Sequence, residues 1–276
     1  MGKLLQYARC GLTVGIPILW SPTYINKYIK HPERYPLEVR WARIQKLIRR
    51  VLKVFRCDIH IEGQENLPKD GRYLVISNHL STFDALVYIA ISDRPITFAA
   101  KEETLEMPFV GKIFKALNGV ALDRKNVMNQ LAEIKQIVNQ IKDESMPLMY
   151  IFPEGTRNKE PQNHCLEFKG GSLKLAYMAR VPIVPFSTFG SFRVLEKKHY
   201  LKRYPIFVKI EKPIYPEEYK DIQSVALADS LKERIDANVD SFRPRDKELV
   251  YAQKLSDKRK AKETLCDNLP AQTLGV

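Results

Sequence analysis

Short apolar runs alternate with amphipathic stretches over most of the chain. The runs have the length and the β-branched or aromatic content of short extended segments, and they fall at 72–77, 96–100, 119–122, 147–152, 183–188 and 206–210. Apolar residues at helical spacing occupy the stretches 83–91, 107–117, 127–142, 171–178 and 227–239. Strands that alternate with helices of this length predict an α/β fold with a mostly parallel sheet flanked by helices.

The segment 40–56 has one apolar and one basic face. Apolar residues recur there at i, i+3, i+4 and i+7, and the remaining positions contain Arg and Lys but no acid. A helix of this kind can lie in the head-group layer of an anionic membrane, which is the interpretation that we favour. The alternative is an ordinary surface helix packed on the core.

An uncharged stretch from Cys10 to Asn26 precedes this helix. It is shorter than the ~20 apolar residues that a spanning helix needs, and Pro17 and Pro22 interrupt it. We expect a short helix that dips into one leaflet without crossing. Residues 1–56 would then be a membrane-associating segment, 57–243 the main domain and 244–276 a charged helix or tail. This arrangement predicts a peripheral, monotopic protein on the cytoplasmic face of the cell membrane.

Composition narrows the function without deciding it. The 276 residues include 45 Lys and Arg against 32 Asp and Glu, so the net charge is +13. Such a charge favours an anionic partner, which could be nucleic acid, a lipid head group or an acidic protein. The four cysteines lie far apart, the five histidines are scattered, and neither CxxC nor HExxH occurs. We therefore expect no metal site and no bound cofactor.

A histidine and an aspartate follow the apolar run 72–77. If His79 lies in a loop and Asp84 in the first turn of the next helix, the carboxylate can meet one imidazole nitrogen and leave the other as a base. No GxSxG motif supplies a nucleophile, so the hydroxyl that His79 deprotonates would belong to the substrate. The alternative is a capping box, because Ser81 precedes Asp84 by three residues.

A second polar group follows the apolar run 147–152. Glu154, Gly155, Thr156 and Arg157 offer a guanidinium, a hydroxyl and backbone N–H groups around a glycine, which suits a phosphate. Arg124 and Lys101 could add positive charge to the same rim. The alternative is a simple turn with a surface arginine.

These segments occur together and in a fixed order. His79 with Asp84, the block from Lys101 to Arg124, the run 152–157 and the run 181–185 resemble the four motifs of the glycerolipid acyltransferase family, most closely its bacterial 1-acyl-sn-glycerol-3-phosphate acyltransferases. The resemblance covers roughly residues 62–213. It implies that His79 is the general base and Asp84 its orienting partner. It also implies a glycerophosphate site that would contain Lys101, Arg124, Glu154, Gly155, Thr156 and Arg157. Pro182 and Pro185 would shape the acyl or acceptor pocket, and the alternative for this run is strand packing.

The resemblance implies transfer of an acyl group from acyl-ACP or acyl-CoA to lysophosphatidic acid, with phosphatidic acid as the product. The thioester is a co-substrate, and the partners would be lysophosphatidic acid, the thioester carrier and an anionic membrane surface, with no nucleic acid. Two alternatives stay open. One is a different acceptor, such as glycerol 3-phosphate or another lysophospholipid, and the other is a non-enzymatic protein that binds anionic lipid.

Overall fold

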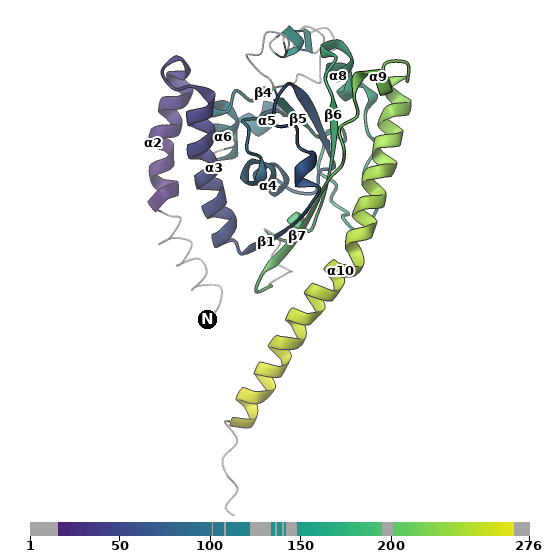
Figure 1. Ribbon diagram of the computed structural model, residues 1–276. Helices are drawn as coiled ribbons and strands as arrows, with labels where there is room; N and C mark the ends of the chain where they lie inside the picture. Colours follow the sequence, from purple (N-terminus) through teal and green to yellow (C-terminus); the bar gives the residue numbers. More distant parts are fainter. Residues whose placement is uncertain are drawn as a thin grey trace, which may run out of the picture.

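The computed structural model describes most of the chain, as Figure 1 shows in colour. The described residues are 16–100, 102–107, 109–121, 134–135, 137–139, 141, 148–194 and 201–267. The side chains of 16–22, 100, 102, 121 and 255–267 are not placed.

A sheet forms the centre of the domain, with the order β1-β7-β6-β2-β5-β3-β4 among the described residues. Neighbouring strands are parallel except β6 and β7, so β1 and β7 run opposite to the other five. The strands are β1 (Cys57–Glu62), β2 (Tyr73–Ser77), β3 (Thr97–Ala100), β4 (Val120–Ala121), β5 (Leu148–Ile151), β6 (Ile183–Phe189) and β7 (Tyr204–Ile210). The predicted mostly parallel α/β fold is confirmed.

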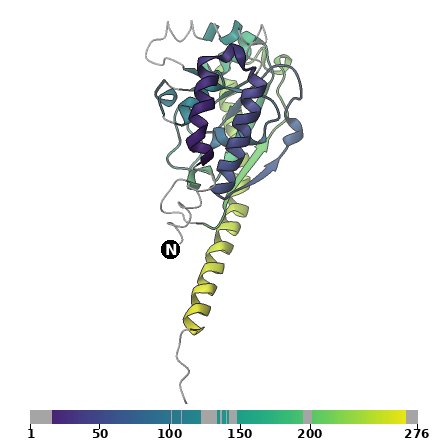
Figure 2. The same cartoon turned by 90° about the vertical axis from the view of Figure 1, so that its left-hand side faces the viewer.

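Helices cover both faces of the sheet and give three layers (Figures 1 and 2). Because successive strand residues point to opposite faces, Val75 of β2 joins the core under one layer and Ile76 the core under the other. The first layer contains α2 (Ile16–Lys30), α3 (Leu37–Val54), α4 (Phe83–Ile91) and α6 (Val110–Ala116). The second layer contains α8 (Lys174–Ala179) and α10 (Ser224–Asp267). Short elements complete the chain: α5 (Glu102–Leu105), α9 (Pro216–Tyr219), η2 (Pro32–Arg34), η3 (Gln64–Asn66), η4 (Gly170–Leu173) and η5 (Ser191–Val194).

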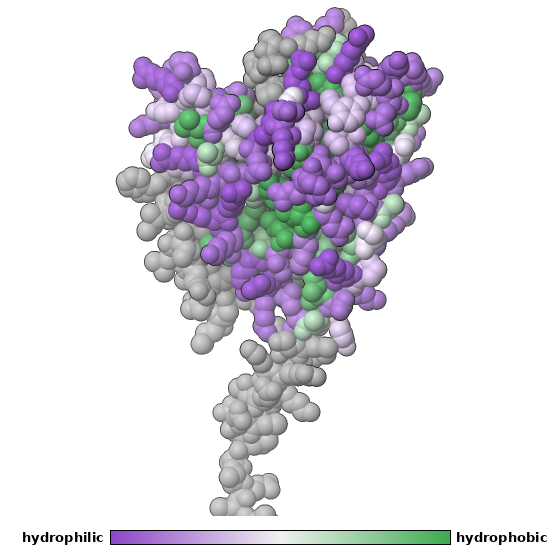
Figure 3. Space-filling view, in the orientation of Figure 1, coloured by the Kyte–Doolittle hydropathy of each residue, from purple (hydrophilic) through white to green (hydrophobic). Residues whose placement is uncertain are grey.

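The prediction that the apolar face of the 40–56 helix lies in a membrane is wrong. Trp41, Ile44 and Ile48 are buried in the domain core, where α3 packs on α4. Arg40, assigned to the basic face, is also buried and donates to Ala116 O at 2.7 Å. The burial of this face in the domain explains the strong apolar periodicity. The outward face of α3 is mostly hydrophilic (Figure 3), with Lys46, Arg49, Arg50 and Lys53 exposed.

Residues 10–15 of the uncharged stretch lie outside the described residues, and its described part, residues 16–26, lies in α2, which packs against α6 and α3. Ile25 and Tyr28 are buried there, so this helix also contributes to the core. In the portion of the chain that is described, no helix combines the length and apolarity needed to cross a membrane.

The last helix is longer than the sequence predicted. Leu227–Val239 was expected to be a helix followed by a separate charged segment, but α10 runs unbroken through Pro244 to Asp267. Its first part packs on β6 and β7, and its last part projects away from the domain (Figure 1). The predicted division at residue 244 therefore lies inside a single helix.

Candidate active site

Three loops meet at one edge of the sheet. Strands β2, β5 and β6 are parallel neighbours, so their carboxyl ends point the same way. The segment 78–82 follows β2, the segment 152–157 follows β5, and Gly190 and Ser191 follow β6. Ligands of open α/β sheets collect at this edge.

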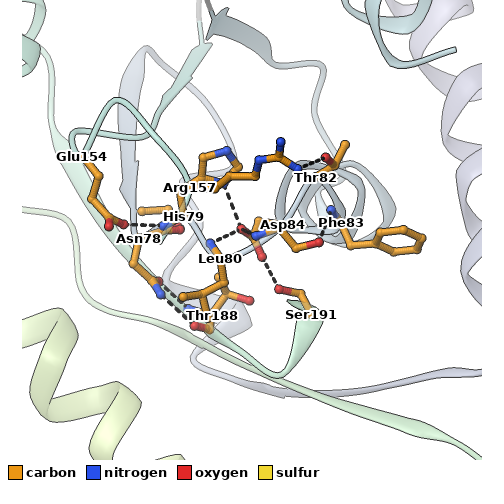
Figure 4. Close-up of polar contacts among 12 residues, drawn as sticks. Asn78, His79, Leu80, Thr82, Phe83, Asp84, Glu154, Arg157, Thr188 and Ser191 are labelled. Atoms are coloured by element: carbon orange, nitrogen blue, oxygen red, sulfur yellow. Dashed lines mark hydrogen bonds and ion pairs between the residues drawn. The ribbon is translucent and has the colours of Figure 1, made fainter. Parts of the chain in front are cut away.

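The predicted pairing of His79 with Asp84 is present. Nδ1 of His79 lies 3.0 Å from Oδ2 of Asp84, which is fully buried at the start of α4 (Figure 4). A hydrogen bond at Nδ1 to a carboxylate fixes the tautomer and leaves Nε2 free to accept a proton. The His79 side chain is 18% exposed, so solvent and substrate can reach the imidazole.

Asp84 also satisfies the main chain of its own loop, which is one half of the predicted capping box; the other half is not formed, because Asp84 N donates to Ser81 O and not to the Ser81 hydroxyl. Its Oδ2 accepts the backbone N–H groups of Leu80 and Ser81, each at 2.7 Å, and Ser81 Oγ accepts from Phe83 N at 3.2 Å. These bonds hold the loop in the turn that brings His79 back onto the carboxylate. One buried side chain thus both shapes the loop and orients the imidazole.

The loop after β5 holds the main chain of His79. Glu154 Oε1 accepts His79 N at 2.5 Å, and Asn158 N donates to His79 O at 2.8 Å. The other oxygen of Glu154 accepts Leu166 N at 3.0 Å. Glu154 is buried, and this burial raises the pKa of its carboxyl to about 7 despite the two backbone bonds. The structure therefore places Glu154 outside the predicted substrate-contacting set, because its carboxylate is occupied by the protein.

The ring of Phe152 lies flat against the imidazole of His79. The ring centroids are 3.8 Å apart and the planes differ by 19°. Together with Asp84 on Nδ1 and the two backbone bonds, this stacking restricts His79 from three directions. Phe152 is the first residue of the run 152–157, and the motif pattern alone predicts no role for it.

A cavity of about 360 Å³ opens beside His79. Thr156 and Arg157 are exposed at its rim, and Nη1 of Arg157 lies 3.4 Å from the hydroxyl of Thr82 (Figure 4). The cavity lining includes the predicted His79, Gly155, Thr156 and Arg157, and apolar side chains of α4, β3 and α6: Ala85, Phe98, Val110 and Phe114. Lys101 and Arg124 lie outside the described residues.

The run 181–185 contributes to the sheet and not to the lining of this cavity. Pro185 is buried in β6 opposite Ile76 of β2, and Pro182 O accepts Leu74 N at 2.9 Å. Of the two roles left open for Pro182 and Pro185, the structure shows strand pairing, and neither proline lines this cavity. Asn78 was missed by sequence analysis: its amide exchanges two hydrogen bonds of 2.9 Å with the backbone of Thr188 and ties the loop to β6.

The site can perform one kind of step well. A neutral imidazole with a fixed tautomer can take a proton from a hydroxyl bound in the cavity, and a nearby guanidinium can hold an anionic group of the same substrate. Within the described residues, no group of His, Cys, Asp and Glu side chains is arranged to hold a metal ion. The fold and the site together define an α/β protein with an oriented histidine–aspartate pair beside a cavity.

Comparisons with known proteins define the family. The family model described as "Acyltransferase" matches residues 58–188. A probable 1-acyl-sn-glycerol-3-phosphate acyltransferase of Mycoplasma pneumoniae is 34% identical over 75% of this chain and 80% of its own. The corresponding protein of Mycoplasma genitalium is 33% identical over 79% and 84%. The chain belongs to the acyltransferase family and is an enzyme of that class.

A solved structure supports the fold. The 1-acyl-sn-glycerophosphate acyltransferase PlsC of Thermotoga maritima matches with a TM-score of 0.66 and 24% identity. The match covers 86% of this chain and 98% of that one. The arrangement of sheet and helices is therefore that of a known acyltransferase.

Proposed function

We propose that the enzyme transfers a fatty acyl group from a thioester to the sn-2 hydroxyl of 1-acyl-sn-glycerol 3-phosphate and so produces phosphatidic acid. The observation that carries this proposal is the cavity that brings together the free nitrogen of His79, the cation of Arg157 and an apolar wall. These are the groups needed by a substrate with a hydroxyl, a phosphate and a fatty chain. The relatives from two Mycoplasma species have names that specify this acceptor.

In the proposed reaction, Nε2 of His79 takes the proton of the acceptor hydroxyl while that oxygen attacks the thioester carbonyl carbon. The tetrahedral intermediate collapses, the carbon–sulfur bond breaks, and the thiolate leaves with the proton returned from Nε2. Asp84, held at Nδ1, stabilises the imidazolium between these two steps. No serine or cysteine of the protein becomes acylated.

The donor is acyl-ACP or acyl-CoA, and both carriers are anionic. The apolar side chains Phe98, Val110 and Phe114 offer a surface for a fatty chain next to the proposed base. Arg157 binds the phosphate of the acceptor, and its planar guanidinium can make two parallel hydrogen bonds to phosphate oxygens.

The proposed location is the cytoplasmic face of the cell membrane, where the enzyme would lie on the surface as a monotopic protein. The acceptor and the product both have fatty chains that are held in the bilayer, so an enzyme that lies on the bilayer surface can reach them. The exposed basic side chains of α3, including Lys46 and Arg50, supply a surface that attracts anionic head groups.

A panel of acceptors tests the proposed function. The purified enzyme is given acyl-CoA or acyl-ACP with lysophosphatidic acid, lysophosphatidylcholine or glycerol 3-phosphate, and products are identified by mass spectrometry. Phosphatidic acid formed at least tenfold faster than any other product is the expected result. Faster acylation of glycerol 3-phosphate or of lysophosphatidylcholine would replace the proposed acceptor with that compound.

A further inference from the structure

The second oxygen of Asp84 is held by a residue far away in the sequence. The hydroxyl of Ser191 donates to Oδ1 at 2.5 Å, from the first position of η5 directly after β6 (Figure 4). Both side chains are fully buried. The carboxylate is therefore fixed from two sides, with His79, Leu80 N and Ser81 N on Oδ2 and the Ser191 hydroxyl on Oδ1.

We propose that Ser191 is a positioning residue for the His79–Asp84 pair. The inference rests on the proposed function, because it assumes that His79 is the base. Without the donor on Oδ1, the plane of the carboxylate is set only by bonds on one oxygen and can rotate about the Cβ–Cγ bond. The hydrogen bond also keeps Oδ2 facing Nδ1 of His79, where the imidazolium needs its partner.

The backbone around Ser191 is built to hold this hydroxyl in one place. Gly190 has φ +97°, and a Cβ atom there would lie 2.3 Å from Pro205 O of β7, so only glycine allows the chain to turn this close to the sheet. The turn brings η5 against α4, the helix that contains Asp84. The turn of the main chain at Gly190 and the packing of η5 on α4 thus fix the position of Ser191.

The C-terminal helix holds the same turn from outside. Arg193 of η5 forms a buried ion pair with Asp246 of α10 and lies 4.8 Å above the ring of Phe192. Asp246 lies two residues beyond Pro244, in the part of the chain to which the sequence assigned no function. This part of α10 therefore supports the turn that carries Ser191.

Ser191→Ala tests the proposal, with Ser187→Ala as the matched control. Ser187 is also a fully buried serine of the same strand region, but its hydroxyl accepts from Asn238 of α10 at 3.1 Å and not from the active site. For Ser191→Ala we expect kcat to fall about 10- to 100-fold, as for loss of a hydrogen bond to a charged group, with both KM values unchanged within about threefold. Ser187→Ala should keep at least half of the wild-type kcat.

The pH profile separates positioning from a purely structural role. Loss of the donor lets the carboxylate turn away from Nδ1 of His79, so the acidic limb of kcat/KM should move in Ser191→Ala and stay in place in Ser187→Ala. The other titratable groups that face Asp84 are His79, Glu154 and Tyr150, and they are common to both variants. Ser191→Cys keeps a weaker donor of similar size, so its acidic limb of kcat/KM should shift in the same direction by a smaller amount. If Ser191→Ala does not fold, Ser191→Cys is the variant that tests the proposal.

A wild-type profile in the Ser191 variants, or an equal loss of kcat in Ser187→Ala, would overturn the proposal. His79→Ala is measured beside them. If His79→Ala is inactive while the Ser191 variants behave as wild type, only the inference on Ser191 fails. If His79→Ala keeps wild-type turnover, the proposed function of His79 fails as well.

Discussion

The loops after β2 and β5 each place a buried carboxylate next to His79, and the two carboxylates have different partners. Asp84, which follows the first loop, binds the imidazole itself, two backbone N–H groups and the hydroxyl of Ser191. Glu154 in the second loop binds only backbone N–H groups, those of His79 and Leu166. The first carboxylate orients the imidazole of His79, whereas the second holds the main chain of the loop that contains His79.

The comparison shows that membership of a motif does not assign a role. Both acids lie in the motif segments that resemble the acyltransferase family, and both are adjacent to the same histidine. Of the two acids, only Asp84 contacts the imidazole ring of His79. We therefore expect loss of Asp84 to affect turnover, whereas loss of Glu154 should first affect stability. Arg157, three residues after Glu154, lines the cavity together with Gly155 and Thr156 of the same loop.

The largest expected effect is that of Asp84→Asn. The amide can present its NH₂ group to Nδ1 and favour the wrong tautomer, so we expect kcat to fall about 10³- to 10⁴-fold. Steady-state kinetics checks this result, with Asp93→Asn as a control because Asp93 is an exposed acid just beyond the other end of α4. A kcat within tenfold of wild type together with a lower melting temperature would reduce Asp84 to a helix cap.

Arg157→Ala should mainly affect acceptor binding. Loss of the guanidinium removes charge-assisted hydrogen bonds to the phosphate, so KM for lysophosphatidic acid should rise about 10- to 100-fold while KM for the thioester stays unchanged. Lys159→Ala is the control, because Lys159 is also exposed on this loop but does not line the cavity. An equal rise of KM in both variants would point to general charge and not to a phosphate site at Arg157.

Glu154→Gln should change how stability depends on pH. The pKa of Glu154 is raised to about 7 in the folded protein, so the folded state favours the protonated acid. This residue then contributes stability below its unfolded pKa, and the contribution is lost as the pH rises toward 7. The free energy of unfolding of the wild type minus that of Glu154→Gln should therefore fall by about 2 kcal/mol between pH 5 and pH 8. Urea denaturation at the two pH values measures it, and a constant difference would contradict the assignment.

The smallest effect concerns the basic face of α3. Lys46→Ala should weaken binding to vesicles that contain anionic phospholipid by about fivefold, close to 1 kcal/mol, and the effect should shrink at high salt. Lys174→Ala removes an exposed lysine from α8 in the opposite layer and is the matched control. Vesicle binding is measured by sedimentation. If Lys46→Ala and Lys174→Ala weaken it equally, the net charge of the protein, and not the basic face of α3, attracts the vesicle.

Local pattern predicted much of the fold, because strand and helix signals depend on neighbouring residues. The helix Phe83–Ile91 was predicted at its observed limits, and the pairing of His79 with Asp84 needed a turn of only five residues. Edge strand β1 was not delimited, although Asp58 and His60 alternate with its apolar residues as expected of a half-buried strand. The amphipathic α3 was misassigned because an apolar stripe is the same whether a core or a membrane covers it.

Long-range contacts limited the prediction of the site. Ser191 is 107 residues from Asp84 in sequence, and a serine after an apolar strand has no local signal for such a contact. Glu154 has the residue type of a substrate-binding acid, and only the fold shows that its oxygens are occupied by His79 N and Leu166 N. Local motif patterns therefore predicted the pairing of His79 with Asp84, whereas the residues that hold this pair could be identified only from the assembled sheet.

The proposed role of His79 as a base for the substrate hydroxyl is tested most directly by the release of free thiol from an acyl thioester, with and without lysophosphatidic acid. Wild-type enzyme should release thiol only when the acceptor is present. His79→Ala should release it about 10³-fold more slowly, with an unchanged melting temperature. A burst of thiol without acceptor would show an acylated enzyme, and turnover of His79→Ala within tenfold of wild type would show that another group is the base. Either result would contradict the mechanism.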